Sequence, residues 1–152
     1  MAVLKKHFST LAMLGFLASC SDNSPVVSQK SQDANNPISA SDLDVICRAL
    51  VATTMGRPID IIKIDKNDGN ITYVSYLRPS DGKEWKLRCK VLGSRVIWST
   101  VDIDGPNTGF GRWRNHPADS VITYSLTPDS VTINEKYSDG SGNTKTFPRE
   151  PK

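Results

Sequence analysis

The chain has 152 residues, enough for one folded domain, and 38% of them are hydrophobic, an ordinary proportion for a globular fold. Its 19 basic and 16 acidic residues give a formal net charge of +3. A charge this close to balance excludes the strong electrostatic footprint of a nucleic-acid-binding protein, so we expect no nucleic-acid partner.

The N-terminus has the three-part layout of a secretory signal. Lys5 and Lys6 give a charged start, an apolar run follows over residues 11–18, and small residues lead into Cys20. The apolar run is about half of the roughly 20 residues that a membrane-spanning helix needs. We therefore predict that residues 1–19 are a signal peptide and are removed.

Within this signal, Leu17-Ala18-Ser19-Cys20 resembles the lipobox of bacterial prolipoproteins. The resemblance covers only the first 20 residues, and it implies cleavage before Cys20 and attachment of diacylglycerol to its sulfur, with acyl chains that hold the protein on a membrane. Ser21 resembles the residue that follows the lipidated cysteine in lipoproteins sorted to the outer membrane. The alternatives are a plain secretory signal with an incidental cysteine and a buried N-terminal helix.

Residues 20–39 combine the lipidated cysteine with a polar stretch that reads SDNSPVVSQKSQDANNPIS from residue 21. Few of these side chains are apolar, so the segment cannot bury enough surface to offset the entropy of ordering it. We expect a flexible tether that joins the anchor to a single globular domain at residues 40–152.

The domain is predicted to begin with an amphipathic helix. Ser41 is the expected N-cap, and Gly56 and Pro58 end the helix. The apolar positions fall at the three-and-four spacing of one helical face: Leu43, Ile46, Cys47, Leu50, Val51 and Thr54.

After the helix the hydrophobic pattern changes to a period of two, typical of strands joined by short turns. In the most regular run, 84–92, apolar side chains alternate with charged ones, so one face is expected to be solvated. The basic side chains of that run are interpreted as this solvated face. The predicted strands lie at about 59–65, 70–78, 84–92, 95–101, 120–126, 130–137 and 144–148.

One helix followed by an antiparallel meander predicts an α+β fold, with the helix packed on a sheet of about six or seven strands. A partly closed β-barrel with the helix as a plug is the alternative arrangement. Strand order beyond adjacent hairpins stays open.

Cys47 and Cys89 each lie on the predicted buried face of their element. An exported protein folds in an oxidising compartment, where two such cysteines usually form a disulfide. Closing a loop of about 43 residues would stabilise the fold by roughly 3 to 4 kcal/mol. A redox or zinc site is the alternative, but there is no Cys-x-x-Cys spacing and His116 is the only histidine after the signal. We therefore predict no metal and no cofactor.

Two acidic stretches resemble metal sites only superficially. Residues 65–70 offer oxygen donors near a glycine, but Gly69 and Tyr76 do not match the positions that a calcium loop requires. Asp102 and Asp104 are two residues apart at a strand end. A hairpin turn and a solvated loop explain these stretches better.

The long irregular loop at 102–119 is the candidate recognition site, because long loops in compact domains are often functional and because Trp and Arg are enriched at binding hot spots. In the alternative, the aromatic side chain packs into the core and the arginines cover a sheet edge. A catalytic role for His116 with Asp119 and Ser120 lacks the motif that presents a nucleophilic serine. The candidate residues are Phe110, Arg112, Trp113, Arg114 and His116.

These features predict a non-enzymatic, membrane-anchored lipoprotein of the bacterial envelope whose domain binds another envelope or surface protein. One alternative is an inhibitor of an envelope hydrolase such as lysozyme. The other is an enzyme that cleaves an envelope polymer through His116 with Asp102 and Asp104.

Overall fold

The structure, a computed structural model, describes residues 38–102 and 109–149, all of which belong to one compact unit, Gln32–Lys152. Cys20, the predicted signal and most of the predicted tether lie outside these ranges, so the expectations about them stay predictions. Within the described ranges, no helix is long and apolar enough to cross a membrane.

The described domain is one helix packed on a seven-stranded antiparallel sheet, which confirms the α+β prediction. The strands follow one another in sequence order from β1 to β7, and the sheet is not closed into a barrel, so the alternative arrangement was wrong. The elements are α1 (Ala40–Thr54), the short 3-10 helix η1 (Ile59–Ile61), β1 (Lys63–Asp68), β2 (Ile71–Leu77), β3 (Glu84–Leu92), β4 (Arg95–Val101), β5 (Val121–Leu126), β6 (Ser130–Lys136) and β7 (Gly142–Pro148).

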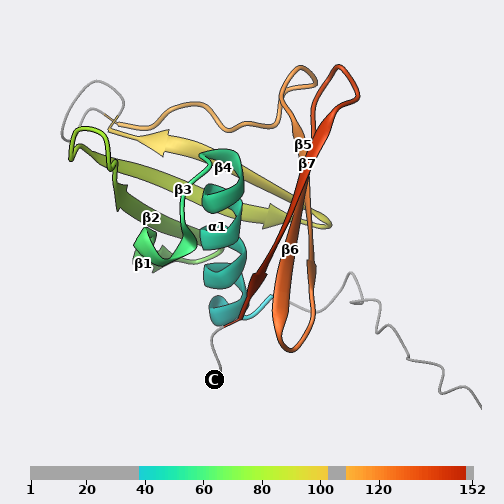
Figure 1. Cartoon of the computed structure of the whole chain (residues 1–152), viewed down its shortest axis with the longest axis horizontal. Coiled ribbons are helices and arrows are strands. Elements are labelled where there is room, and N and C mark those ends of the chain that lie inside the picture. Colours follow the sequence, from blue (N-terminus) through green and yellow to red (C-terminus); the bar gives the residue numbers. More distant parts are fainter. Residues whose placement is uncertain (1–37, 103–108, 150–152) are drawn as a thin grey trace, which may run out of the picture. The chain divides into compact units, whose positions relative to one another are not determined.

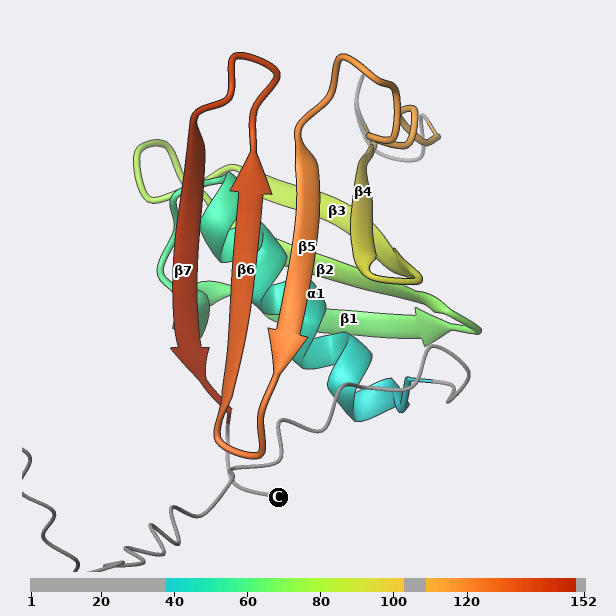
Figure 2. The same ribbon diagram turned by 90° about the vertical axis from the view of Figure 1, so that its right-hand side faces the viewer.

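The sheet bends sharply between β4 and β5. These two strands pair only at Arg95 and Thr123, whereas the other neighbouring strands pair along most of their length. Figure 1 shows that β5–β7 consequently run across the direction of β1–β4, and α1 lies in the angle between the two groups. The view in Figure 2 shows the helix behind β5–β7 and in front of β1–β3. One helix thus provides the core contacts for both parts of the sheet.

The helix begins at a capping side chain that comes just before its apolar positions. The side chain of Ser39 accepts a hydrogen bond from the backbone N–H of Asp42 at 3.1 Å, so the cap lies two residues before the predicted Ser41. Leu43, Ile46 and Leu50 are buried, as their spacing predicts. They pack against inward-facing side chains of both parts of the sheet, including Leu87, Ile122, Val131 and Ile133.

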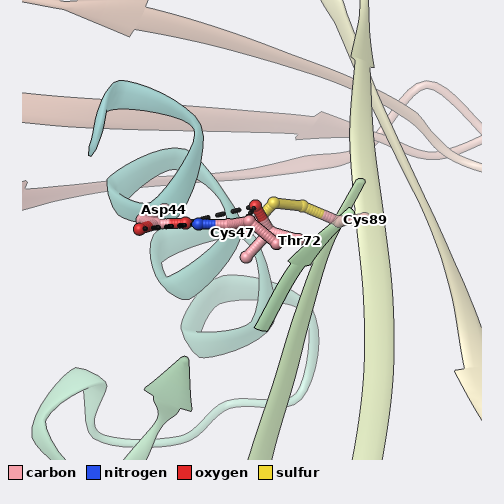
Figure 3. The surroundings of a disulfide bond; sticks show 5 residues. Asp44, Cys47, Thr72 and Cys89 are labelled. Carbon is pink, nitrogen blue, oxygen red and sulfur yellow. Dashed lines mark hydrogen bonds between the residues drawn. A yellow bond between two sulfur atoms is a disulfide. The ribbon is translucent and has the colours of Figure 1, made fainter. Parts of the chain in front are cut away.

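A disulfide joins the helix to the sheet and confirms the predicted pairing of Cys47 with Cys89. Both cysteines are fully buried, and their Cα atoms are 5.9 Å apart, within the usual range for a disulfide. Figure 3 shows the bond running from α1 to β3 beside Asp44 and Thr72. Asp44 accepts a hydrogen bond from the hydroxyl of Thr72 at 3.2 Å, so α1 is also tied to β2.

The strand predictions were accurate except around the first hairpin. Residues 59–61 form a 3-10 turn, and β1 starts at Lys63, later than predicted. The following turn is centred on Gly69 and Asn70, because Asp68 still pairs with Ile71. Gly69 has a φ of 59°, a conformation that glycine adopts without strain, which explains why the chain reverses there.

Candidate functional site

The second half of the long loop is an ordered segment that lies along β4. Its Phe110 pairs with Val101, and the N–H groups of Gly111 and Arg114 donate to the carbonyls of Thr100 and Trp98 at 3.0 and 2.8 Å. This segment occupies the part of the β4 edge that β5 leaves unpaired. The bend in the sheet and the placement of the loop are therefore one structural feature.

The carboxylate of Asp119 holds the end of the segment by hydrogen bonds to residues within it. Both of its oxygens accept hydrogen bonds from the guanidinium of Arg112 at 2.6 Å, and the backbone N–H of His116 donates to one of them at 2.9 Å. The hydrogen bonds from Arg112, opposed by partial desolvation and supported by that from His116, hold the pKa of Asp119 well below its usual value of 3.8. Asp119 is therefore ionised at neutral pH and fixes the conformation of residues 112–119.

Two rings from this segment enclose an arginine of the sheet. The guanidinium carbon of Arg88, on β3, lies 3.8 Å from the ring centroid of Phe110 and 4.4 Å from that of Trp113. These distances are well inside the range of cation–π attraction. The segment is thus held against the outer face of the sheet by its rings as well as by its backbone.

The arrangement continues on both sides of Arg88. The ammonium of Lys90 lies 4.7 Å from the ring centroid of Trp113, and that of Lys66 lies 4.5 Å from the ring centroid of Tyr73. Tyr73 in turn packs beside Phe110, with 6.3 Å between ring centroids. We call these six side chains the cation–aromatic strip: Lys66, Tyr73, Arg88, Lys90, Phe110 and Trp113.

The strip lies on the face of β1–β4 that points away from the helix. Cys89 points inward to its disulfide with α1, and side chains alternate along a strand, so Arg88 and Lys90 point outward. Arg88 pairs with Tyr73 on β2, and Tyr73 pairs with Lys66 on β1, so these three form one row across the sheet. A row of this kind is fixed by strand register and does not depend on loop mobility.

Two open depressions border the strip. One, of about 820 Å³, is lined by the loop residues Arg112, Trp113, Asn115, His116 and Pro117. The other, of about 660 Å³, lies toward the opposite end of β3. Its lining includes Lys66, Tyr73, Lys86 and Phe110 and the acidic residues Asp65, Glu84 and Asp102. Phe110 itself has 53% of its surface exposed although it is a large apolar side chain. The strip and its borders therefore present both rings and charge to solvent.

The structure brings together some of the predicted recognition residues, while others contact different partners within the domain. Phe110 and Trp113 belong to the strip. Arg112 is committed to Asp119, and the guanidinium of Arg114 lies over the ring of Trp98 at 5.3 Å. The two arginines that flank Trp113 in sequence therefore have partners within the domain, and the cations beside its ring come from β3.

Among the described residues, His116, Asp119 and Ser120 do not contact one another as a catalytic triad would. The ring nitrogen Nδ1 of His116 accepts the backbone N–H of Ala118 at 3.1 Å, while the hydroxyl of Ser120 donates to Glu135 at 2.8 Å. Asp119 holds Arg112 instead of the imidazole. Asp104 lies outside the described residues, and within residues 38–102 and 109–149 no group of three metal-binding side chains comes together.

Sequence reasoning missed Lys66, Tyr73, Arg88 and Lys90 as site residues. The run from Glu84 to Leu92 indicated correctly that Arg88 and Lys90 face outward, but it gave no sign that rings from the long loop would cover them. The strand register places Tyr73 opposite Arg88 on the outer face, and this pairing of a ring with a cation is the signal that could have identified both residues.

No known protein family matches the chain, and no curated protein or solved structure matches it.

Proposed function

We propose that the chain is a lipoprotein of the bacterial envelope, anchored through lipid on Cys20, whose domain binds another envelope protein without catalysing a reaction. The binding surface is the cation–aromatic strip with the adjoining residues 109–119. The lipobox-like stretch before Cys20 supports the anchor, and the strip supports recognition.

The observation that carries the proposal is the fixed presentation of Phe110 and Trp113. Backbone hydrogen bonds to β4 hold this segment, and the hydroxyl of Ser99 adds another by donating to the carbonyl of Gly111 at 2.6 Å. A ring that is already ordered loses little entropy when a partner covers it, and aromatic and arginine side chains supply most hot-spot energy in protein interfaces. A preordered aromatic surface of this kind suits a protein partner.

The test is photo-crosslinking in living cells. A photoreactive phenylalanine analogue at position 110 should yield a discrete crosslinked protein, because 53% of Phe110 is exposed at the centre of the proposed surface. The matched control is the same analogue at Tyr137, an aromatic residue that is 41% exposed and lies just after β6, in the other part of the sheet.

A crosslinked partner at position 110 and none at 137 supports the proposal. No crosslink at 110, or the same set of products at both positions, contradicts it. When the partner is a hydrolase, its activity with and without the purified lipoprotein shows whether binding inhibits it.

The anchor is tested separately at Cys20. Cys20→Ala should abolish incorporation of labelled fatty acid and leave uncleaved or mislocalised precursor, because no thiol is left to receive the lipid. Normal processing of the unchanged chain without labelled lipid would remove this part of the proposal.

A further inference from the structure

Three cations of the strip have no acidic partner in the part of the chain that the structure describes. Among residues 38–102 and 109–149, no carboxylate forms an ion pair with Lys66, Arg88 or Lys90. Their charged groups lie against ring faces, and the Nε–H of Arg88 is buried without a hydrogen-bond partner. An aromatic ring attracts a cation without neutralising its charge, so positive potential persists on this face.

The neighbouring Lys86, unlike these three cations, has acidic partners. Lys86 is on the same face of β3, but its ammonium lies 3.5 Å from Glu84 and 3.5 Å from Asp102. Its charge is therefore balanced within the domain. The uncompensated positive charge is therefore concentrated at the Arg88 and Lys90 end of the strand, because Lys66 borders a depression that Asp65, Glu84 and Asp102 also line.

The spacing of Arg88 and Lys90 matches the repeat of an extended peptide. They are two residues apart on one strand, so their side chains leave the sheet roughly 7 Å apart. An extended peptide repeats at the same interval, and carboxylates at its alternate positions would meet one cation each. Arg88 is half-buried between two rings and its Nε–H is buried, so its two terminal Nη groups are the donors that would pair with a carboxylate.

Exposed apolar side chains lie at both ends of this cationic region. Leu92, two residues beyond Lys90 on the same face of β3, is 47% exposed, and Phe110 lies over Arg88. Such contacts exclude water around charge-assisted hydrogen bonds and so favour a protein segment with apolar flanks.

We infer that the outer face of β1–β4 binds an extended acidic segment of the partner protein, with carboxylates at alternate residues facing Arg88 and Lys90. This inference rests on the proposed function. A protein segment fits better than a lipid surface, because membrane-binding clusters carry roughly four to eight basic side chains and the strip has fewer.

The experiment measures the binding of a fluorescent peptide to the purified full-length chain by anisotropy. The probe alternates glutamate with serine; the control peptide carries as many glutamates at every third position, so that successive carboxylates point to opposite faces of an extended chain. The protein variants are Arg88→Gln/Lys90→Gln and, as a charge-matched control on β6 and β7, Lys136→Gln/Lys145→Gln.

The alternating peptide should bind more tightly than the control peptide, and the β3 double variant should weaken its binding by about tenfold or more while the control variant changes it by less than about twofold. Equal binding by both double variants, or no preference between the peptides, overturns the inference. Binding of phosphatidylglycerol vesicles without binding of the peptide also overturns it.

Crosslinking from position 110 separates this inference from the proposed function. Capture of one partner with equal efficiency by the unchanged chain and by Arg88→Gln/Lys90→Gln overturns the inference and leaves the proposed function standing. Failure to capture any partner in the unchanged chain counts against the proposed function, whatever the peptide result.

Discussion

The two parts of the sheet do the same work on their inner faces and different work on their outer faces. Inward, both pack apolar side chains on α1. Outward, β1–β4 carries rings and cations that have no acidic partner among the described residues. The outer face of β5–β7 carries mainly hydroxyl and amide groups that bond to one another, Thr132 with Thr146 at 2.8 Å and Thr144 with Asn134 at 2.9 Å, with Lys136 at the end of β6. The packing of the inner faces on α1 stabilises the fold. The difference between the outer faces indicates where a partner binds.

The largest expected effect concerns the disulfide, which attaches only the β1–β4 part covalently to the helix. Cys47→Ala/Cys89→Ala should lower the free energy of unfolding by about 3 to 4 kcal/mol, because the unfolded chain is no longer constrained by a link between two residues that are 42 apart in sequence. Chemical denaturation with and without reductant measures it. An unchanged midpoint under reducing conditions would show that the bond contributes little.

The next effect separates binding from stability at Trp113, which is half-buried and lies outside the core cluster. Trp113→Ala should weaken partner binding by about 2 kcal/mol or more. The free energy of unfolding should fall by only about 1 kcal/mol, because the lost contacts are mainly with Arg88 and Lys90. A fall in folding stability of about 3 to 5 kcal/mol, the range for a core aromatic, would contradict this assignment.

A smaller effect follows from the low pKa of Asp119. A carboxylate whose pKa is lower in the folded than in the unfolded state stabilises the fold above the unfolded value of 3.8 and loses that contribution as the pH falls through the folded value. The Asp119 carboxyl carbon, followed by NMR, should therefore titrate below pH 3.8 in the unchanged chain. In Arg112→Gln its pKa should rise toward 3.8, because the main hydrogen-bond donor is gone. Titration at about the same pH in both proteins would rule out this role for Arg112.

The smallest effect is expected on the outer face of β5–β7. Thr132→Val removes one exposed side-chain hydrogen bond and keeps a β-branched residue, so unfolding should change by no more than about 0.5 kcal/mol. Crosslinking from position 110 should be unaffected. Loss of the crosslink in this variant would show that part of the binding surface lies on β5–β7 and would contradict the proposed surface.

Much of the fold follows from periodicity in the sequence. The run 84–92 alternates so regularly that both ends of β3 were predicted, and the helical spacing from Leu43 to Val51 placed Cys47 on the face that meets Cys89. The bend between β4 and β5 was not predicted, because it depends on a backbone pairing between the loop and β4 that no periodic pattern encodes.

The candidate site was predicted only in part for a related reason. Composition singled out Phe110 and Trp113 as an unusual pair in a loop. The cations beside them come from strands that are neighbours through register, and Arg112, which looked available for a partner, is bound to Asp119 seven residues later. Which cation meets which ring is settled by tertiary packing.

We expect the outer face of β1–β4, and not that of β5–β7, to be the binding surface. Amide hydrogen exchange of the full-length chain, with and without the partner captured from position 110, tests it most directly. If this face binds the partner, exchange should slow in β3, β4 and residues 109–119 and stay unchanged in β6 and β7. Protection concentrated in β6 and β7 would contradict it.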